Sequence, residues 1–161
     1  MNKKIFAVLA IFVLVIVAGC GNSVKSDLDE YMKFQQTSSA EAGPIIADFN
    51  SKASQIMSNR QSMNSKEEKL AALNDVVQKF TTIADKQKAY KPKTKEVQDL
   101  HDKAIKQMDM TLEELNKIIQ AVQTDSFDQS TLDDINKKRQ ELQQVAKEYN
   151  DDLKVLQEKY K

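Results

Sequence analysis

Two kinds of hydrophobic pattern divide the chain. From Ile5 to Ala18 every residue is apolar, and Lys3 and Lys4 stand just before that run. From Asp27 onwards, apolar residues recur instead at spacings of three and four, with charged and amide residues between them. Such spacing is typical of amphipathic helices that bury one face. The first pattern predicts a membrane-directed segment, and the second predicts a helical body.

The first half of the helical body contains two predicted helices. One begins at Asp27 and is interrupted at Gly43-Pro44, where we expect a kink or a break because proline removes a backbone hydrogen bond. The motif Ser65-Lys66-Glu67-Glu68 matches a capping box, in which Ser65 caps the helix and Glu68 reaches back. It predicts the start of a second helix, and Lys91-Pro92 predicts the end of that helix near Tyr90.

The second half contains two more predicted helices. A third should begin around Pro92-Lys93-Thr94 and continue to about Val122, and a polar turn should follow over residues 124–129. A fourth should begin near Ser130 and run to about Tyr160. Short connections place successive helices side by side and antiparallel. The sequence therefore predicts an all-α fold, an elongated antiparallel bundle of three to four long helices with the first one kinked or broken at Gly43-Pro44.

Composition agrees with long helices. The whole chain has three glycines, two prolines and no tryptophan, so residues that break helices are scarce. Basic and acidic residues number 24 each. Such a balance lacks the basic stripe that nucleic acids require and the polybasic patch that binds anionic membranes.

The N-terminal residues carry a more specific motif. A positive start, an apolar run and then small residues are the layout of a secretory signal, and the run is shorter than the roughly 20 residues of a transmembrane helix. Val17-Ala18-Gly19-Cys20 follows, and Cys20 is the only cysteine in the chain. This segment resembles the lipobox of bacterial lipoproteins. The resemblance implies that a diacylglyceryl group joins the Cys20 thiol and that a signal peptidase cuts between Gly19 and Cys20.

Three regions follow from that resemblance. Residues 1–19 would be the signal peptide, residues 20–26 a lipidated cysteine with a flexible tether, and residues 27–161 one helical-bundle domain. Two acyl chains give stable anchoring, so the processed protein should stay on the extracytoplasmic face of the cell membrane. Cys20 would then be unavailable for a disulfide. The alternative is an uncleaved anchor helix in which the cysteine is incidental.

The residues of the body do not assemble into a recognisable catalytic or metal-binding motif. His101 is the only histidine, stands next to Asp102, and is expected on the flank of its helix. The segment Asp125-Ser126-Phe127-Asp128 lacks the ligand and glycine positions of a calcium loop. Adjacent acidic residues diverge around a helix and should form solvated faces; these pairs are Glu113-Glu114, Asp133-Asp134 and Asp151-Asp152. We therefore expect neither an enzyme nor a cofactor.

Methionines and aromatic residues are the remaining candidates for contact with a partner. Core packing is the expected role of the five methionines of the body, although methionine surfaces can also bind partners adaptably; these are Met32, Met57, Met63, Met108 and Met110. Tyr31 and Phe34 stand close enough to the tether to touch lipid headgroups, but a core position is expected for Tyr31.

Three functions are compatible with this pattern. The first is a lipid-anchored helical interaction or scaffold protein that binds another envelope protein or the cell wall. The lipobox and the helical body resemble small lipoproteins of Gram-positive bacteria described as cell-wall binding. The second is a carrier that holds a small apolar ligand or lipid between its helices. The third is a precursor of a short apolar pheromone, since residues 12–19 resemble such peptides.

Overall fold

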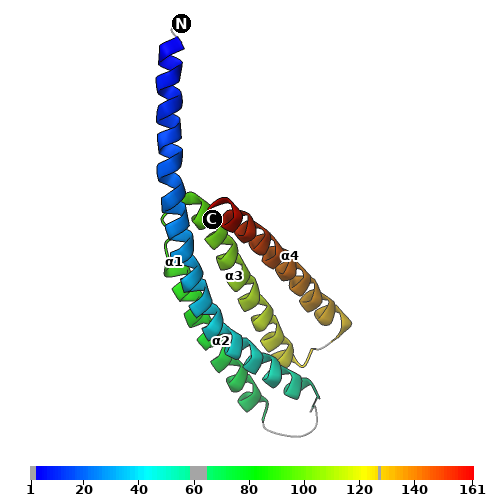
Figure 1. The fold of residues 1–161 in the computed structure, drawn as a ribbon. Coiled ribbons are helices and arrows are strands. Elements are labelled where there is room, and N and C mark those ends of the chain that lie inside the picture. The colour runs from blue at the N-terminus through cyan, green and yellow to red at the C-terminus, as the bar shows by residue number, and fades with distance from the viewer. Residues whose placement is uncertain (1–2, 59–64, 127) are drawn as a thin grey trace.

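Helices make up nearly all of the described chain, and no strand occurs there. The computed structural model describes the backbone of residues 3–58, 65–126 and 128–161, and the side chains of 23–53, 55–56, 65–126 and 128–161. The helices are α1 (Lys3–Ser58), α2 (Lys66–Ala89), α3 (Lys95–Thr124) and α4 (Gln129–Lys159). They alternate in direction as an elongated bundle, and the N-terminal part of α1 projects beyond it (Figure 1). The predicted all-α bundle is confirmed.

Helix α1 runs through Gly43 and Pro44 without ending, so the predicted break at this dipeptide is wrong. Both residues are exposed, so the proline ring lies on the side of the helix that faces water, where unpaired backbone oxygens can be hydrated. Beyond it, Ile45, Ile46 and Phe49 belong to the main hydrophobic core and hold the next turn in place. Figure 1 shows α1 curving along the bundle; a sharp kink at Pro44 itself stays a prediction.

The packed body begins earlier than the sequence indicated. Residues 20–26 are part of α1, and Val24 is only 3% exposed. Val24 lies one helical turn before Leu28 on the same face, and both side chains belong to one hydrophobic cluster. The flexible tether predicted for residues 20–26 therefore does not hold at Val24, because burial of this side chain ties the backbone to the bundle.

The other helix ends follow local chemistry. The Ser65 hydroxyl accepts a hydrogen bond of 3.3 Å from the backbone N–H of Glu68, which confirms Ser65 as the cap of α2. Helix α3 ends at Thr124, because the left-handed backbone of the next residue, Asp125 (φ 51°), halts the helical repeat. The Asp128 carboxylate accepts a bond of 2.8 Å from Thr131 N–H and caps α4, close to the predicted start at Ser130.

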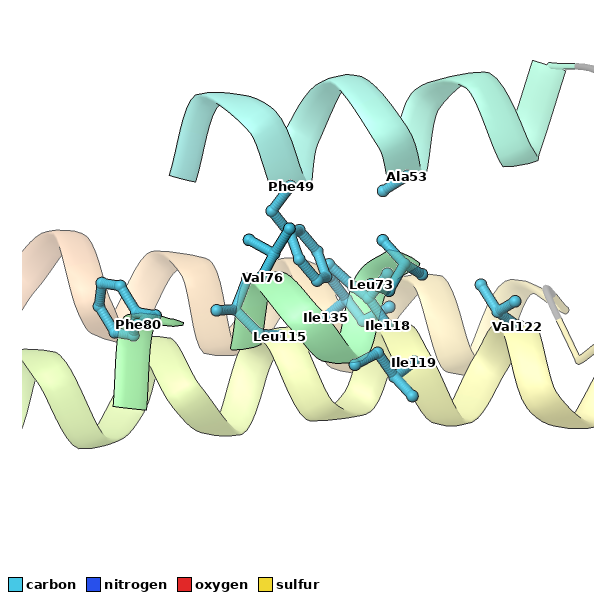
Figure 2. Packing of buried hydrophobic residues seen from close by; sticks show 10 residues of the cluster. All are labelled: Phe49, Ala53, Leu73, Val76, Phe80, Leu115, Ile118, Ile119, Val122 and Ile135. Atoms are coloured by element: carbon cyan, nitrogen blue, oxygen red, sulfur yellow. The ribbon is translucent and has the colours of Figure 1, made fainter. Parts of the chain in front are cut away.

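Two hydrophobic clusters hold the helices together. The larger one joins all four helices, as Figure 2 shows; its buried members are Phe49, Ala53, Leu73, Val76, Phe80, Leu115, Ile118, Ile119, Val122 and Ile135. The smaller one lies at the end of the bundle from which α1 projects, and its fully packed members are Val24, Leu28, Tyr31, Val97 and Leu100. Side chains from the end of α4, including Tyr149, Leu153 and Tyr160, pack against the smaller cluster.

A buried carboxylate fixes the connection between α2 and α3. Asp27 of α1 is 1% exposed, and its Oδ2 atom accepts hydrogen bonds from Lys93 N–H (2.9 Å), Thr94 N–H (2.8 Å) and the Thr94 hydroxyl (2.7 Å). Thr94 is the N-cap residue of α3 and makes no side-chain cap bond of its own. Asp27 therefore caps α3 from a neighbouring helix, where its negative charge also favours the positive end of the helix dipole.

The helices are not packed symmetrically. Helix α1 contacts α2 closely and α3 less, α2 contacts α3, and α3 contacts α4. Within the described residues, no Cα atom of α4 lies within 8 Å of α1 or α2. The backbones of the first and last helices are thus held apart.

Candidate functional site

The space between α1 and α4 forms a groove of about 1050 Å³. Helix α3 contributes Ala104, Met108 and Leu115 to it, and α2 contributes Phe80. Apolar side chains also line it from the two flanking helices, namely Met32, Ala42 and Ile46 from α1 and Leu142, Tyr149 and Leu153 from α4. The groove is therefore largely apolar over the surface that the three helices provide.

Amide and hydroxyl groups also line the groove and make part of its surface polar. Gln36, Ser39, Asn50 and Gln143 line it and are exposed to water, so they form its polar margins. Inside it, the side-chain nitrogen of Gln107 is buried and has no hydrogen-bond partner among the described residues. A buried donor without a partner costs about 1–3 kcal/mol. An occupant with an oxygen acceptor at this position would recover that cost.

Three other polar residues of the lining, Gln35, Glu114 and Arg139, have side-chain partners. Gln35 and Gln87 exchange two amide hydrogen bonds of 3.1 and 2.9 Å, and Gln87 is fully buried. Arg139 donates from Nε (3.0 Å) and Nη2 (2.6 Å) to one oxygen of Glu114. These two charges neutralise each other, so Lys33 is the remaining charged residue of the groove lining.

An aromatic cluster packs beside the α2–α3 turn. Tyr31, fully buried, lies 5.6 Å from the ring of His101 in an edge-on arrangement, and Tyr90 meets the same histidine at 5.6 Å. Phe34 stacks on Tyr90 with ring centres 4.1 Å apart. Burial is the main reason that the pKa of the Tyr31 hydroxyl is raised far above its usual range, and burial also raises the pKa of Tyr149.

His101 differs from its prediction. It is 4% exposed and lies in the core rather than on the flank of α3, because its ring packs against both Tyr31 and Tyr90. Neither ring nitrogen has a hydrogen-bond partner of normal geometry in the described part of the chain. Burial lowers the pKa of His101, so the neutral ring is favoured. Its surroundings indicate packing and not metal ligation.

The predicted lipidation site is only partly visible. Gly19 and Cys20 lie in α1, but their side chains, like those of Ile5 to Ala18, fall outside the described residues. Among the described residues, no helix is both long and apolar enough to cross a membrane. The described part of the chain also contains no group of three or more histidine, cysteine, aspartate or glutamate side chains that could hold a metal ion.

Several of the adjacent acidic residues join helices instead of only facing water, whereas Asp133 and Asp151 are exposed and bond within α4. Glu113 pairs with Lys138 at 2.6 Å, and Asp134 pairs with Lys117 at 2.9 Å, so both link α3 to α4. Glu114, which pairs with Arg139, has a side chain that is only 12% exposed, and the solvated face predicted for it is therefore wrong. Sequence spacing within one helix could not show that basic residues of the next helix stand opposite.

The methionines and Tyr31 fit the predictions better. Tyr31 is fully buried, which confirms a core position. Met32 and Met108 line the groove, where they combine packing with partial exposure, and Met110 is half-buried. Met63 and the side chain of Met57 lie outside the described residues.

The groove itself was missed by the sequence analysis. One usable feature was present in α3, where Gln107, Thr111 and Glu114 follow one another at helical spacing beside the apolar stripe. All three line the groove. A row of polar residues beside an apolar face is also common where the buried side of a helix meets its exposed side. The distance between α1 and α4 was therefore needed to identify the groove.

No protein family model matches the chain, and neither a curated protein nor a solved structure is similar enough to be a match.

Proposed function

We propose that this protein is a lipid-anchored extracytoplasmic binding protein, whose groove between α1 and α4 takes an amphipathic helix of another envelope protein. The anchor is proposed from the lipobox residues Gly19 and Cys20. The observation that carries the binding role is the separation of α1 from α4, which leaves apolar side chains of three helices beside open space. Helix bundles commonly bind partners at such unfilled positions.

The dimensions of the groove support a helical occupant. Along α1 its lining runs from Met32 to Asn50, which corresponds to about 27 Å of helix at 1.5 Å per residue. A partner helix of about 18 residues would match that length. Its apolar stripe would face Met108 and Leu115 of α3, and its polar residues would meet the amides at the margins.

The chemistry of the margins favours a protein over a small apolar ligand. Gln36 on α1 and Gln143 on α4 are both exposed, so the groove opens to water between them. A small apolar ligand is held best where most of its surface is enclosed. An amphipathic helix can leave its polar face in that opening. The methionines of the groove also suit a partner surface, because their flexible side chains adapt to its shape.

Site-specific photocrosslinking in cells tests the binding role. A photoreactive amino acid is placed at Gln36 or at Gln143, and matched controls carry it at Glu141 on the opposite side of α4 or at Asn74 of α2, both exposed. We expect both groove positions to capture the same protein and both controls to miss it. Mass spectrometry of the crosslinked peptide should find an amphipathic helical sequence. Capture from the control positions with equal yield, or binding to purified cell wall without any protein crosslink, would contradict the proposal.

Fatty-acid labelling tests the anchor separately. Cys20→Ala should lose incorporation of labelled palmitate, because no other thiol is present in the chain. Ser23→Ala, three residues further along α1, serves as the control and should label normally. Unchanged labelling of the Cys20→Ala protein would refute the lipid anchor and leave the groove proposal to the crosslinking experiment.

A further inference from the structure

The connection between the proposed anchor and the bundle is helical and short. Asp27 lies seven positions after Cys20, and the whole interval belongs to α1. At 1.5 Å per residue this is about 10 Å along the helix axis. Val24, in the middle of that interval, is buried in the smaller hydrophobic cluster. A buried side chain one turn from the anchor leaves little freedom for the bundle to swing relative to it.

The end of the bundle nearest Cys20 is built from two further elements. Asp27 binds the backbone of Lys93 and Thr94, so the α2–α3 turn lies beside this part of α1. The end of α4 reaches the same level, because Tyr160 packs against the cluster and its hydroxyl donates to Glu96 Oε1 at 3.2 Å. Figure 1 shows both elements gathered where α1 leaves the bundle.

We infer that this end of the bundle, formed by the α2–α3 turn and the last turn of α4, rests on the lipid headgroups and holds the molecule upright on the membrane. The inference rests on the proposed lipid anchoring of Cys20. The headgroup layer of one leaflet is about 5–8 Å thick, so a bundle end only about 10 Å from the lipidated residue meets its outer surface.

The side chains at this end suit contact with headgroups. Lys91 is exposed, and its ammonium donates to the backbone oxygen of Lys88, not to a carboxylate. Lys159 is exposed and lies over the ring of Tyr160, 4.9 Å from its centre. Lysine and tyrosine are residues that favour the interface between membrane and water, where the ammonium can pair with lipid phosphates.

An upright bundle fixes the orientation of the groove relative to the membrane. Met32 and Asn50 stand about 18 Å and about 45 Å from Cys20 along α1, so the groove runs away from the membrane rather than along it. A helix bound there would also point away from the membrane. The groove therefore suits the outward continuation of a membrane-spanning helix better than a peptide lying flat on the lipid surface.

Spin-label accessibility tests the orientation. The full chain is produced as the lipoprotein and placed in vesicles of phosphatidylethanolamine and phosphatidylglycerol that contain a nickel-chelating lipid. A nitroxide is attached to Lys91→Cys or, as the control, to Gln129→Cys. Both residues are exposed, both donate one local hydrogen bond, and they lie at opposite ends of the bundle. The lipid occupies the Cys20 thiol, so each variant offers one reactive cysteine.

The headgroup nickel should relax the label at position 91 several-fold more strongly than the label at 129. Insertion of about twelve glycine and serine residues between Asn22 and Ser23 should reduce this difference, because the bundle can then tumble. Equal relaxation at both positions, or a difference that the insertion leaves unchanged, would overturn the upright orientation. Flotation with the vesicles reports the anchor independently. A protein that floats but shows equal relaxation refutes only the orientation, whereas a protein that does not float refutes both proposals.

Discussion

Asp27 is the single residue on which the geometry at one end of the bundle depends most. One of its oxygens accepts three hydrogen bonds from the α2–α3 turn, while its Oδ1 atom is buried without a partner in the described structure. The carboxylate thus joins α1 to two other helices through short contacts. The unpaired Oδ1 atom is tolerated because the Oδ2 atom accepts from backbone donors that would otherwise be unpaired.

Asp27→Ala should lower the free energy of unfolding by about 2–3 kcal/mol, because it removes a helix cap and leaves two part-buried backbone donors without this acceptor. Urea denaturation followed by circular dichroism measures the change. Asp29→Ala is the matched control, since Asp29 is exposed and faces Lys25 at 3.9 Å. That substitution should cost less than about 0.5 kcal/mol. Equal losses in the two variants would show that the cap contributes nothing beyond an ordinary surface charge.

His101 makes the stability of the fold dependent on pH. Burial lowers the pKa of its ring in the folded protein, so the unfolded chain binds a proton more readily. Its contribution is complete above the unfolded pKa of about 6.5 and is lost as the pH falls through the lower folded pKa. Stability should therefore decrease on acidification. The nearby carboxylate of Asp102 opposes the shift, and the charge of Lys91 adds to it.

The His101→Phe protein isolates this effect, because phenylalanine keeps a ring against Tyr31 and Tyr90 but cannot take up a proton. Urea unfolding at about pH 7.5 and about pH 5.5 should show a larger loss of stability for the original protein than for the variant. The carboxylates titrate equally in both proteins, so their contributions to the pH dependence cancel in the comparison. The same loss in both would assign the pH dependence to groups other than His101.

Among the elements, α1 carries the clearest conflict between local propensity and packing. Gly43 and Pro44 are the two residues least suited to a helix interior, yet the helix continues through them. An added Cβ at Gly43 would meet nothing within 4 Å, and no glycine of the described chain has a positive φ. Glycine is therefore not required at this position by either space or backbone geometry.

Gly43→Ala should raise the free energy of unfolding by about 0.5–1 kcal/mol, because alanine restricts the unfolded chain and favours the helix. The reciprocal change Ala47→Gly, one turn later on the same exposed side, should lower it by a similar amount. Thermal or urea unfolding of both proteins checks the pair. Destabilisation by Gly43→Ala would mean that the curvature of α1 depends on the glycine.

The positions of the helices were predicted well wherever they depend on local effects of the sequence. Ser65 capped α2, the Lys91-Pro92 pair followed its end, and the spacing of apolar residues located all four helices. The errors concern effects that act across helices. The core around Phe49 carried α1 through Pro44, and the aromatic rings of other helices buried His101. The groove depends on the distance between α1 and α4, which no periodicity within one helix contains.

For the whole molecule, the uneven packing predicts uneven stability. Helix α3 lies between the other helices and has nine buried residues, whereas only Ile135 and Val145 are buried in α4. The other links from α4 to α3 are partly buried side chains at its end, such as Tyr149 and Leu153, and ion pairs such as Lys138–Glu113 and Lys117–Asp134. Exposed pairs contribute about 0–1 kcal/mol each, so α4 should open without unfolding the rest.

Hydrogen exchange measured by mass spectrometry should therefore show backbone amides of α4 exchanging at least about tenfold faster than those of α3. Ile135→Ala should speed the exchange of α4 further and leave α2 nearly unchanged, because Ile135 is a main contact of α4 with the larger core. Equal protection of α3 and α4 would show that the bundle opens only as one unit. If a partner helix fills the groove, it adds a second face of contact to α4, and the protection of α4 should then approach that of α3. A looser α4 in the free protein is what would let the groove widen to admit a helix and close on it afterwards.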